Sequence, residues 1–510
     1  MTVPALEEFI IGIRTMPSEP PTRSSNWKRD FAGELLQILG PDGIISSPEE
    51  LIAYECDGLT GYRIKPIFVV LPRSAKGVSD VIKLCNRENV PFVPRGAGTG
   101  LSGGALPAED GVLISLSRMN RIIEIDIQNQ RVVAEPGVVN LWVSNAVEGS
   151  GYYYAPDPSS QLVCTIGGNV AENSGGVHCL KYGVTTNHVL GLEVVLPDGE
   201  IVEFGGKTLD HTGYDLVGLF VGSEGLLGIV TKVILRILRK PESIRTILGA
   251  FEKIEDAGAA VSGITARGII PAGMEIMDNL SIRAVEEAVQ PGYPQDAGAI
   301  ILIELDGPSA EVEAQMPLVI DVLKENRAKE VRVARGAEER ALFWKGRKSA
   351  FAAMGRISPD YYVQDGVIPR TKLASVLGEI EKLSAMYGLR VANVFHAGDG
   401  NLHPLILYDA SKEGELEKAE ELSGEILRVC VDAGGSITGE HGVGYDKKRF
   451  MPLMFGEHDL DTMYLIRCAF DPKGLCNPGK LFPTPRSCVE SGRQKYKEHP
   501  IEKSGLGERF

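Results

Sequence analysis

The chain has 510 residues, 43% of them hydrophobic, and a formal net charge of −15. That length favours two or three domains. The acidic balance argues against a nucleic-acid or anionic-membrane surface, because either would need clustered Lys and Arg. No apolar run approaches the roughly 20 residues that span a bilayer, and Glu7 and Glu8 argue against a signal peptide. Eight cysteines are scattered without a C-x-x-C pair, which predicts reduced thiols, a cytoplasmic location and no four-cysteine iron–sulfur site in this chain.

The predicted elements begin with a helical lead-in over residues 1–60, in which Ser47 and Glu50 form a capping box. A buried-type strand at 67–71, an amphipathic helix at 78–85 and a strand at 91–93 follow. We expect them to form a small β-α-β unit. The next loop then lies at the carboxyl end of a strand, where open α/β sheets bind ligands.

That loop, residues 93–105, has five glycines in thirteen residues. Glycine permits positive φ and removes side chains, so backbone N–H groups can approach a phosphate or pyrophosphate. Residues 98–103 match the G-x-G-x-x-G fingerprint of NAD sites, with acidic residues 124 and 126 roughly 20 positions later. NAD binding needs a helix directly after the loop, and the breaks at Pro107 and Gly111 leave no room for one. We therefore disfavour NAD.

A second loop-rich segment spans residues 155–176 and is dominated by Pro, Asp, Ser and Gly. Ordinary turns have this composition, but beside the first glycine loop we interpret it as the other wall of a cradle for an extended dinucleotide. A third glycine-rich turn at 222–228 enters a strand at 229–237. The other elements predicted up to this point are strands at 112–116, 122–127, 132–135, 192–196 and 201–204 and a helix at 141–147.

The character of the chain changes near Lys240-Pro241. Beyond it, strand and helix signals alternate, which predicts an α+β domain with a sheet covered on one face. Strands are expected at 246–251, 273–277, 300–305 and 331–333, with helices ending near 266, 289 and 324. We expect four parts in the whole chain: the lead-in (1–60), a domain built around the glycine loops (61–241), a second domain (242–485) and a polar tail (486–510).

Two histidines of the second domain flank a predicted hairpin turn. Strand-like residues lead into His396 and follow His403, and Asp399-Gly400 lies between them. A two-residue turn at Asp399-Gly400 would pair His396 with His403, about 5 Å apart on one face of a sheet. Two imidazoles at that spacing can share a divalent metal ion, although paired polar strand residues also occur without one.

Glu440 and His441 follow a strand-like stretch at 435–438 and precede two glycines. Adjacent strand residues point to opposite faces, so either Glu440 completes a His/His/Glu metal set while His441 faces another ligand, or the reverse. Such a set with open positions suits a catalytic metal. Arg347 is predicted to lie on a helix. Its position alone suggests a solvated face, and its functional interpretation is a bidentate clamp on a substrate carboxylate.

Taken together, these motifs resemble the FAD-linked oxidases of the vanillyl-alcohol oxidase (PCMH-type flavoprotein) superfamily. The resemblance runs from Glu55 to Lys480 and is specific to the branch of D-lactate, D-2-hydroxyglutarate and glycolate dehydrogenases. Residues 346–362 are similar to the flavin-binding D subunits of bacterial glycolate oxidases. The implied fold is α+β: a PCMH-type FAD-binding domain of two α/β subdomains, and a cap domain with a mainly antiparallel sheet whose last part returns to the flavin.

The same resemblance implies the site. Thr99 stands where some members of the superfamily attach FAD to a histidine, so FAD is expected to bind noncovalently. A divalent metal ion (Zn²⁺ or Mn²⁺) would bind His396, His403 and Glu440, while Arg347 would bind the substrate carboxylate and His441 would act as the base. The residues implied to bind FAD are Pro94, Arg95, Gly96, Ala97, Gly98, Thr99, Gly100, Leu101, Ser102, Gly103, Gly104, Pro156, Asp157, Ser160, Gly167, Gly168, Asn169, Asn173, Gly175, Gly176, Glu224, Gly228, Ile229, Glu440 and Asn477.

The expected reaction is oxidation of a small 2-hydroxy acid, glycolate to glyoxylate in the first place, with hydride transfer to flavin N5. D-Lactate and D-2-hydroxyglutarate are the alternatives. Relatives that act on 2-hydroxyglutarate have a lysine shortly before the residue that matches Asp365, where this chain has Val363-Gln364. Electrons would pass to an iron–sulfur partner subunit, beside a companion FAD-binding subunit, with membrane association through these partners. A non-catalytic FAD-binding subunit is a remote alternative, which the cap-domain histidines disfavour.

Overall fold

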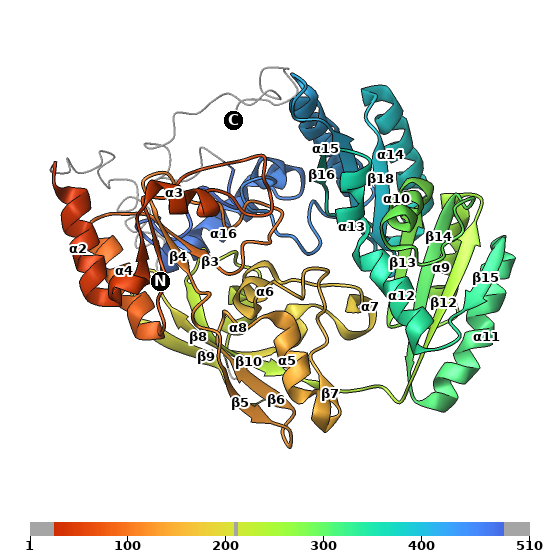
Figure 1. The fold of residues 1–510 in the computed structure, drawn as a ribbon, viewed down its shortest axis with the longest axis horizontal. Helices are drawn as coiled ribbons and strands as arrows, with labels where there is room; N and C mark the ends of the chain where they lie inside the picture. The colour runs from red at the N-terminus through yellow and green to blue at the C-terminus, as the bar shows by residue number, and fades with distance from the viewer. Residues whose placement is uncertain (1–24, 209–212, 484–510) are drawn as a thin grey trace.

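The computed structural model describes residues 25–208 and 213–483. Its first sheet has the strand order β1-β2-β4-β3 and contains the predicted β-α-β unit (Figure 1). The strands β2, β4 and β3 are parallel, and α4 packs on them. The glycine loop begins where β3 ends, as predicted. The elements are α2 (Trp27–Leu39), β1 (Ile44–Ile45), α3 (Pro48–Leu51), β2 (Phe68–Val70), α4 (Ala75–Arg87), β3 (Phe92–Arg95) and β4 (Val112–Ser115).

The second sheet is antiparallel, in the order β5-β6-β10-β8-β9. Three helices, α5, α6 and α8, pack on it through buried apolar residues such as Val143, Val170 and Phe220. One of them corrects the sequence interpretation, because α6 lies inside the segment that was expected to be loop throughout. The elements are β5 (Ile122–Asp126), β6 (Arg131–Ala134), α5 (Asn140–Val147), β7 (Tyr152–Tyr153), α6 (Ile166–Glu172), α7 (Cys179–Tyr182), β8 (Val189–Val195), β9 (Ile201–Gly205), α8 (Leu216–Phe220), β10 (Ile229–Arg236) and β11 (Leu238–Arg239).

The cap domain is built on one antiparallel sheet with the path β15-β12-β14-β13-β18-β19-β16, and β17 also pairs with β19. Its strands are β12 (Ser243–Phe251), β13 (Gly273–Asp278), β14 (Ala299–Gly307), β15 (Glu330–Val333), β16 (Asp360–Val363), β17 (Gly366–Val367), β18 (Val391–His396) and β19 (Asn401–Tyr408). Its helices are α9 (Ile254–Ala266), α10 (Asn279–Val289), α11 (Ser309–Glu325), α12 (Ala337–Lys348), α13 (Ala350–Ala353), α14 (Leu373–Tyr387) and α15 (Glu415–Asp432).

Helices cover both faces of the cap sheet, so the expectation of one covered face is wrong. The helices α9, α11, α14 and α15 pack on one face, and α10, α12 and α13 pack on the other. The cause is visible in β14, where Ile301 and Ile303 belong to one core and Ile300 and Leu302 to the other. A strand that is apolar on both sides must be buried on both sides.

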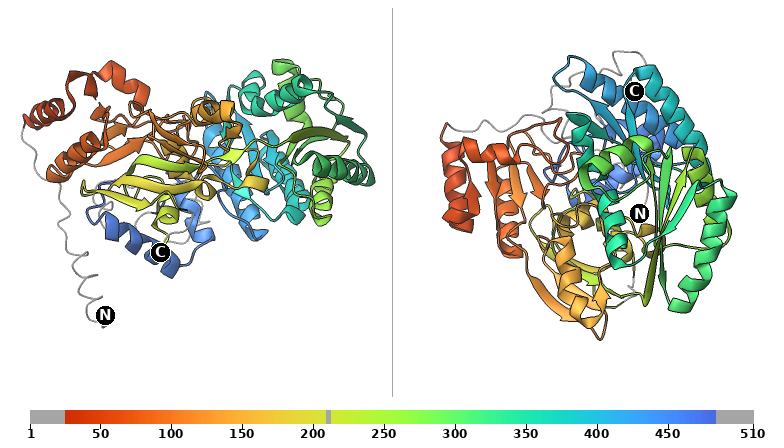
Figure 2. Two further views of the ribbon diagram at one scale, coloured as in Figure 1. Left: turned by 90° about the horizontal axis from the view of Figure 1, so that it is seen from below. Right: turned by 45° about the vertical axis from the view of Figure 1, so that its right-hand side comes forward.

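The last described segment leaves the cap domain and returns to the first sheet. The carbonyl of Leu475 accepts the Phe92 N–H, and the Asn477 N–H donates to the Phe92 carbonyl. In the left view of Figure 2 this segment, in blue with α16 (Glu457–Phe470), lies against the first domain. In the part of the chain that the structure describes, no helix is long and apolar enough to cross a membrane.

Candidate active site at the domain junction

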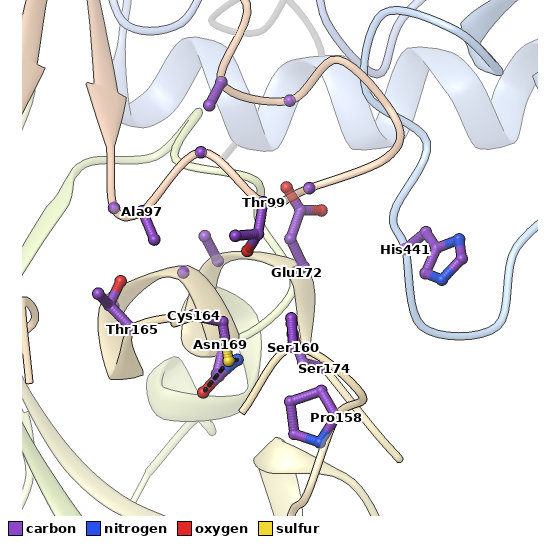
Figure 3. A pocket seen from close by; sticks show the side chains of 18 of the residues that line it. Ala97, Thr99, Pro158, Ser160, Cys164, Thr165, Asn169, Glu172, Ser174 and His441 are labelled. Atoms are coloured by element: carbon purple, nitrogen blue, oxygen red, sulfur yellow. Dashed lines mark hydrogen bonds between the residues drawn. The ribbon is translucent and has the colours of Figure 1, made fainter. Parts of the chain in front are cut away.

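A cavity of about 430 Å³ lies between the first glycine loop, α6 and the cap domain (Figure 3). Residues from all three glycine-rich segments line it, which is the arrangement that the sequence predicts. It reaches His403, Glu440 and His441 at its cap end. The predicted cofactor residues that line it are Pro94, Arg95, Gly96, Ala97, Gly98, Thr99, Gly100, Leu101, Gly104, Ser160, Gly167, Gly168, Asn169, Glu224, Gly228, Ile229 and Glu440.

Eight predicted cofactor residues lie behind this lining: Ser102, Gly103, Pro156, Asp157, Asn173, Gly175, Gly176 and Asn477. Several of them hold the walls together. The Nδ2 group of Asn477 donates to the carbonyls of Gly104 (3.0 Å) and Glu224 (2.7 Å), and so ties two walls to the returning segment. The carbonyl of Ser102 accepts the Tyr445 N–H.

The first glycine loop packs directly on α6 and its preceding turn. A Cβ atom on Gly96 would overlap the hydroxyl of Thr165, and one on Gly104 would come within 2.5 Å of Glu172 Oε1. Gly100, by contrast, has no atom within 4 Å of the place where its Cβ would lie. The loop is therefore tightly packed at Gly96 and Gly104 and open at Gly100, where backbone N–H groups can approach a phosphate.

Three donors converge at the cap end of the cavity. Glu440 Oε1 lies 3.2 Å from His396 Nε2 and 3.5 Å from His403 Nε2, and His396 Nδ1 is 2.8 Å from Glu275 Oε1. An outer carboxylate on the second imidazole nitrogen is the usual companion of a metal-binding histidine. The three side chains are buried or nearly so, and they fit a divalent metal ion with open positions.

The predicted pairing of the two histidines is wrong by two residues, although their proximity is as expected. His396 pairs with Asn401, and His403 pairs with Val394. The turn contains four residues, 397–400, rather than two, because the Gly400 N–H bonds back to the His396 carbonyl. A shift of two residues keeps a side chain on the same face. The imidazole rings therefore still meet, with centroids 5.1 Å apart.

The segment before Glu440 is also not the predicted strand. It forms an isolated bridge at Ser436 and then a loop, whose N–H groups wrap around the carboxylate of Asp365. Asp365 Oδ2 accepts the backbone N–H groups of Gly439 (3.0 Å) and His441 (3.0 Å), and the ammonium of Lys447 (3.0 Å). Because the backbone is curved, Glu440 and His441 point into one site instead of to opposite faces. The two rings of His403 and His441 stack with centroids 4.8 Å apart.

Burial and charge set the protonation of these groups. Burial lowers the pKa of His441 to about 4, so its imidazole is neutral at pH 7 and can accept a proton. For Glu440, burial is outweighed by the charge of His396, and its pKa falls to about 2. For His396 without a bound metal ion, the charges of Glu275 and Glu440 outweigh burial and raise the pKa well above its ordinary value; a metal ion would have to displace this proton. The site thus combines a neutral base with an anionic ligand.

Arg347 does not lie on a solvated helix face. It is 1% exposed, and its guanidinium lies 2.6 Å from Glu275 Oε2, so the two side chains form a buried ion pair. The same Glu275 carboxylate also contacts His396. It is not among the residues that line the cavity. Its neighbour Lys348 does line the cavity, with Nζ 3.1 Å from Asp157 Oδ2.

Sequence reasoning missed several residues of the site. Asp365, Glu275 and Lys447 support the loop and the histidines, but isolated charged residues in a strand or loop have no local pattern that marks them. Glu172 lines the cavity from within the second glycine-rich segment. Its place in the sequence, directly before the predicted cofactor residue Asn173, could have indicated it.

Comparisons with known proteins identify the family and the fold. Residues 66–205 match the model of an FAD binding domain, and residues 240–481 match that of the C-terminal domain of FAD linked oxidases. The chain is 53% identical over 449 residues to glycolate oxidase subunit GlcD of Escherichia coli (strain K12), covering 88% of this chain and 90% of that protein. It is 34% identical over 429 residues to a D-lactate dehydrogenase of Anaerostipes hadrus, covering 82% and 90%. A solved structure of p-cresol methylhydroxylase with substrate bound shares the fold, with a TM-score of 0.78, 18% identity and coverage of 92% and 99%.

Proposed function

The chain belongs to the FAD-linked oxidases, and from that premise we propose that it oxidises glycolate to glyoxylate at the cavity end formed by His403, Glu440 and His441. The observation that carries the proposal is the imidazole of His441, stacked on His403 beside a His/His/Glu set at one end of a glycine-lined cavity. The 53% identity to a glycolate oxidase subunit supports glycolate as the substrate. D-Lactate is the second candidate, supported by the 34% identity to a D-lactate dehydrogenase.

Each residue of the site would have one role in the proposed oxidation. His441 would take the hydroxyl proton at Nε2, which lies 3.9 Å from Glu440 Oε1. The proposed metal ligands His396, His403 and Glu440 would hold a divalent ion, which lowers the pKa of a bound hydroxyl group. Arg347 is proposed to bind the substrate carboxylate with a donor left over beside Glu275; because it lies outside the cavity lining, its side chain would have to turn toward the cavity to do so. Bound FAD supplies the hydride acceptor.

The remaining parts of the proposal concern cofactor attachment, partners and domain limits. We propose noncovalent FAD, because Thr99 lines the cavity where a histidine would be needed for attachment. The E. coli relative is named as a subunit of glycolate oxidase. This name supports the proposal that the present chain also works with companion subunits. The cysteines are scattered along the sequence without a C-x-x-C pair, and we propose an iron–sulfur partner subunit as electron acceptor and a cytoplasmic protein that reaches a membrane through its partners. The proposed domain limits are 61–241 and 242–485.

The test is anaerobic reduction of the bound flavin. The purified protein should show flavin absorbance that bleaches fastest with glycolate, compared with D-lactate and D-2-hydroxyglutarate. His441→Ala should keep bound FAD and bleach at least 100-fold more slowly, in the range usual for loss of a general base, roughly 10²–10⁴-fold. Faster bleaching by D-lactate would replace glycolate as the substrate, and an active His441→Ala variant would refute the base assignment.

A further inference from the structure

Glu172, the last residue of α6, places its carboxyl group where the first glycine loop meets the loop after His441. A Cβ atom on Gly104 would come within 2.5 Å of Oε1, and one on Gly442 would overlap Oε2. Figure 3 shows Glu172 beside Thr99, with His441 on a separate loop across from them. The carboxyl group thus forms part of the cavity wall at the end where the reaction is proposed.

The Oε2 atom of Glu172 is buried and has no hydrogen-bond partner among the described residues. Its acidic neighbour Glu224 is different, because it accepts the N–H groups of Val443 (2.7 Å) and Gly444 (2.7 Å). A buried polar atom without a partner is costly. Oε2 itself has almost no accessible surface, so a ligand in the cavity can meet this carboxyl group only through its other oxygen, Oε1.

The protonation of Glu172 determines what it can offer that ligand. Burial and the charge of Glu224 raise the pKa of Glu172 well above its ordinary value. A neutral carboxylic acid has an O–H group, so it can donate a hydrogen bond. An ionised carboxylate here would repel phosphates, whereas a neutral acid suits a carbonyl oxygen.

The position along the cavity selects the part of FAD that meets Glu172. The redox-active ring must lie close to the substrate, and therefore close to His441. Gly442, which adjoins the Glu172 carboxyl, directly follows His441 in the chain. With the reaction at His441, the ring of a bound FAD, rather than its pyrophosphate, would lie nearest to Glu172.

We propose that Glu172 donates a hydrogen bond to the carbonyl edge of the flavin ring and so favours its reduced form. Two-electron reduction increases the negative charge on this edge of the ring, and a fixed donor stabilises developing charge more than it stabilises the neutral ring. The inference rests on the proposed position of the reaction at His441, but it does not depend on which 2-hydroxy acid is oxidised.

The test compares Glu172→Met with Glu172→Gln, which have similar lengths but differ in whether a donor remains. We expect Glu172→Met apoprotein to bind FAD roughly two- to tenfold more weakly, the range for one hydrogen bond. Reduced FAD should lose more affinity than oxidised FAD, and a tenfold difference would lower the two-electron midpoint potential by about 30 mV. Glu172→Gln should stay close to the wild type in both quantities.

The measurements are reconstitution of apoprotein with FAD and potentiometric titration with dithionite. Because dithionite replaces the substrate, failure to oxidise glycolate would leave the result for Glu172 intact. An unchanged potential and affinity in Glu172→Met would overturn the proposal. So would a melting temperature of the Glu172→Met apoprotein well below that of Glu172→Gln, since this would show that the carboxyl group serves the fold rather than the cofactor.

Discussion

At the scale of single residues, the sequence predicted residues that are proposed to bind ligands. It did not predict the role of the residues that support them. His396, His403 and Glu440 stand in short motifs with glycines and turns, and the structure brings them together. Asp365 and Glu275 are two of 68 acidic residues, and nothing in their neighbourhood marks them. Their importance comes from partners far away in the chain, which only the fold reveals.

Glu275 carries a specific prediction, because both Arg347 and His396 depend on its carboxylate. Glu275→Ala would leave a guanidinium buried without its partner, which costs about 3–5 kcal/mol. We expect the free energy of unfolding in urea to fall by that amount. The double variant Glu275→Met/Arg347→Met removes both charges and should lose clearly less. Equal losses in the two variants would show that the unpaired guanidinium is not the cause of the loss.

At the scale of elements, most strands and helices follow from apolar periodicity, and the errors lie where hydrogen bonds to distant groups override it. The hairpin of β18 and β19 was predicted, but its four-residue turn was not. The loop at 439–441 was expected to continue a strand, because its residues are compatible with one. The carboxylate of Asp365 competes for its N–H groups and bends it instead. No local pattern encodes that competition.

Gly400 gives the turn between β18 and β19 a test. It has φ +85°, and a Cβ atom would overlap the carbonyl of Ile368. Gly400→Ala should therefore destabilise the protein by about 1–3 kcal/mol, the cost of a strained backbone residue. Gly378→Ala is the matched control, because this α14 glycine has no atom within 4 Å of a new Cβ and alanine favours helix. Thermal melting should show a loss for the first variant and no loss for the second. Similar melting temperatures for both would mean that the turn tolerates a side chain.

At the scale of the whole molecule, the FAD-binding and cap domains meet through charged residues around α7. His178 Nδ1 lies 3.0 Å from Asp157 Oδ1, and its Nε2 lies 3.2 Å from Glu304 Oε1 in the cap sheet. Lys181 pairs with Asp306 nearby, and Lys348 reaches back from α12 to Asp157. The sequence could not predict this contact, since it joins residues more than 100 positions apart.

The His178 contact makes the stability of the junction depend on pH. Burial opposes protonation, but the charges of Asp157 and Glu304 outweigh it and raise the pKa of His178 to about 10. The pKa of a histidine in an unfolded chain is about 6.5. The folded state therefore binds the proton more tightly, and this stabilisation is complete below pH 6.5 and is lost as the pH rises through 10.

We therefore expect the melting temperature to fall between pH 7 and pH 10 more steeply in the wild type than in His178→Gln, which cannot take up the proton. Lys348 and Arg340 also face this cluster. Differential scanning calorimetry at several pH values measures the effect. Parallel curves for the two proteins would show that His178 is not protonated in the folded state.

The returning segment also fixes the order in which the molecule can be completed during synthesis. Asn477 is bonded to Gly104, 373 residues earlier, and the strand β3 is bordered by residues 475–477. A ribosome that has made the whole glycine loop, α6 and most of the cap domain has not yet made this wall. Domains generally fold as they emerge from the ribosome, but here the wall of the flavin-binding domain needs residues 475–477, which are made after the cap domain. We therefore expect the cofactor site to be complete only after residues 475–477 have been made.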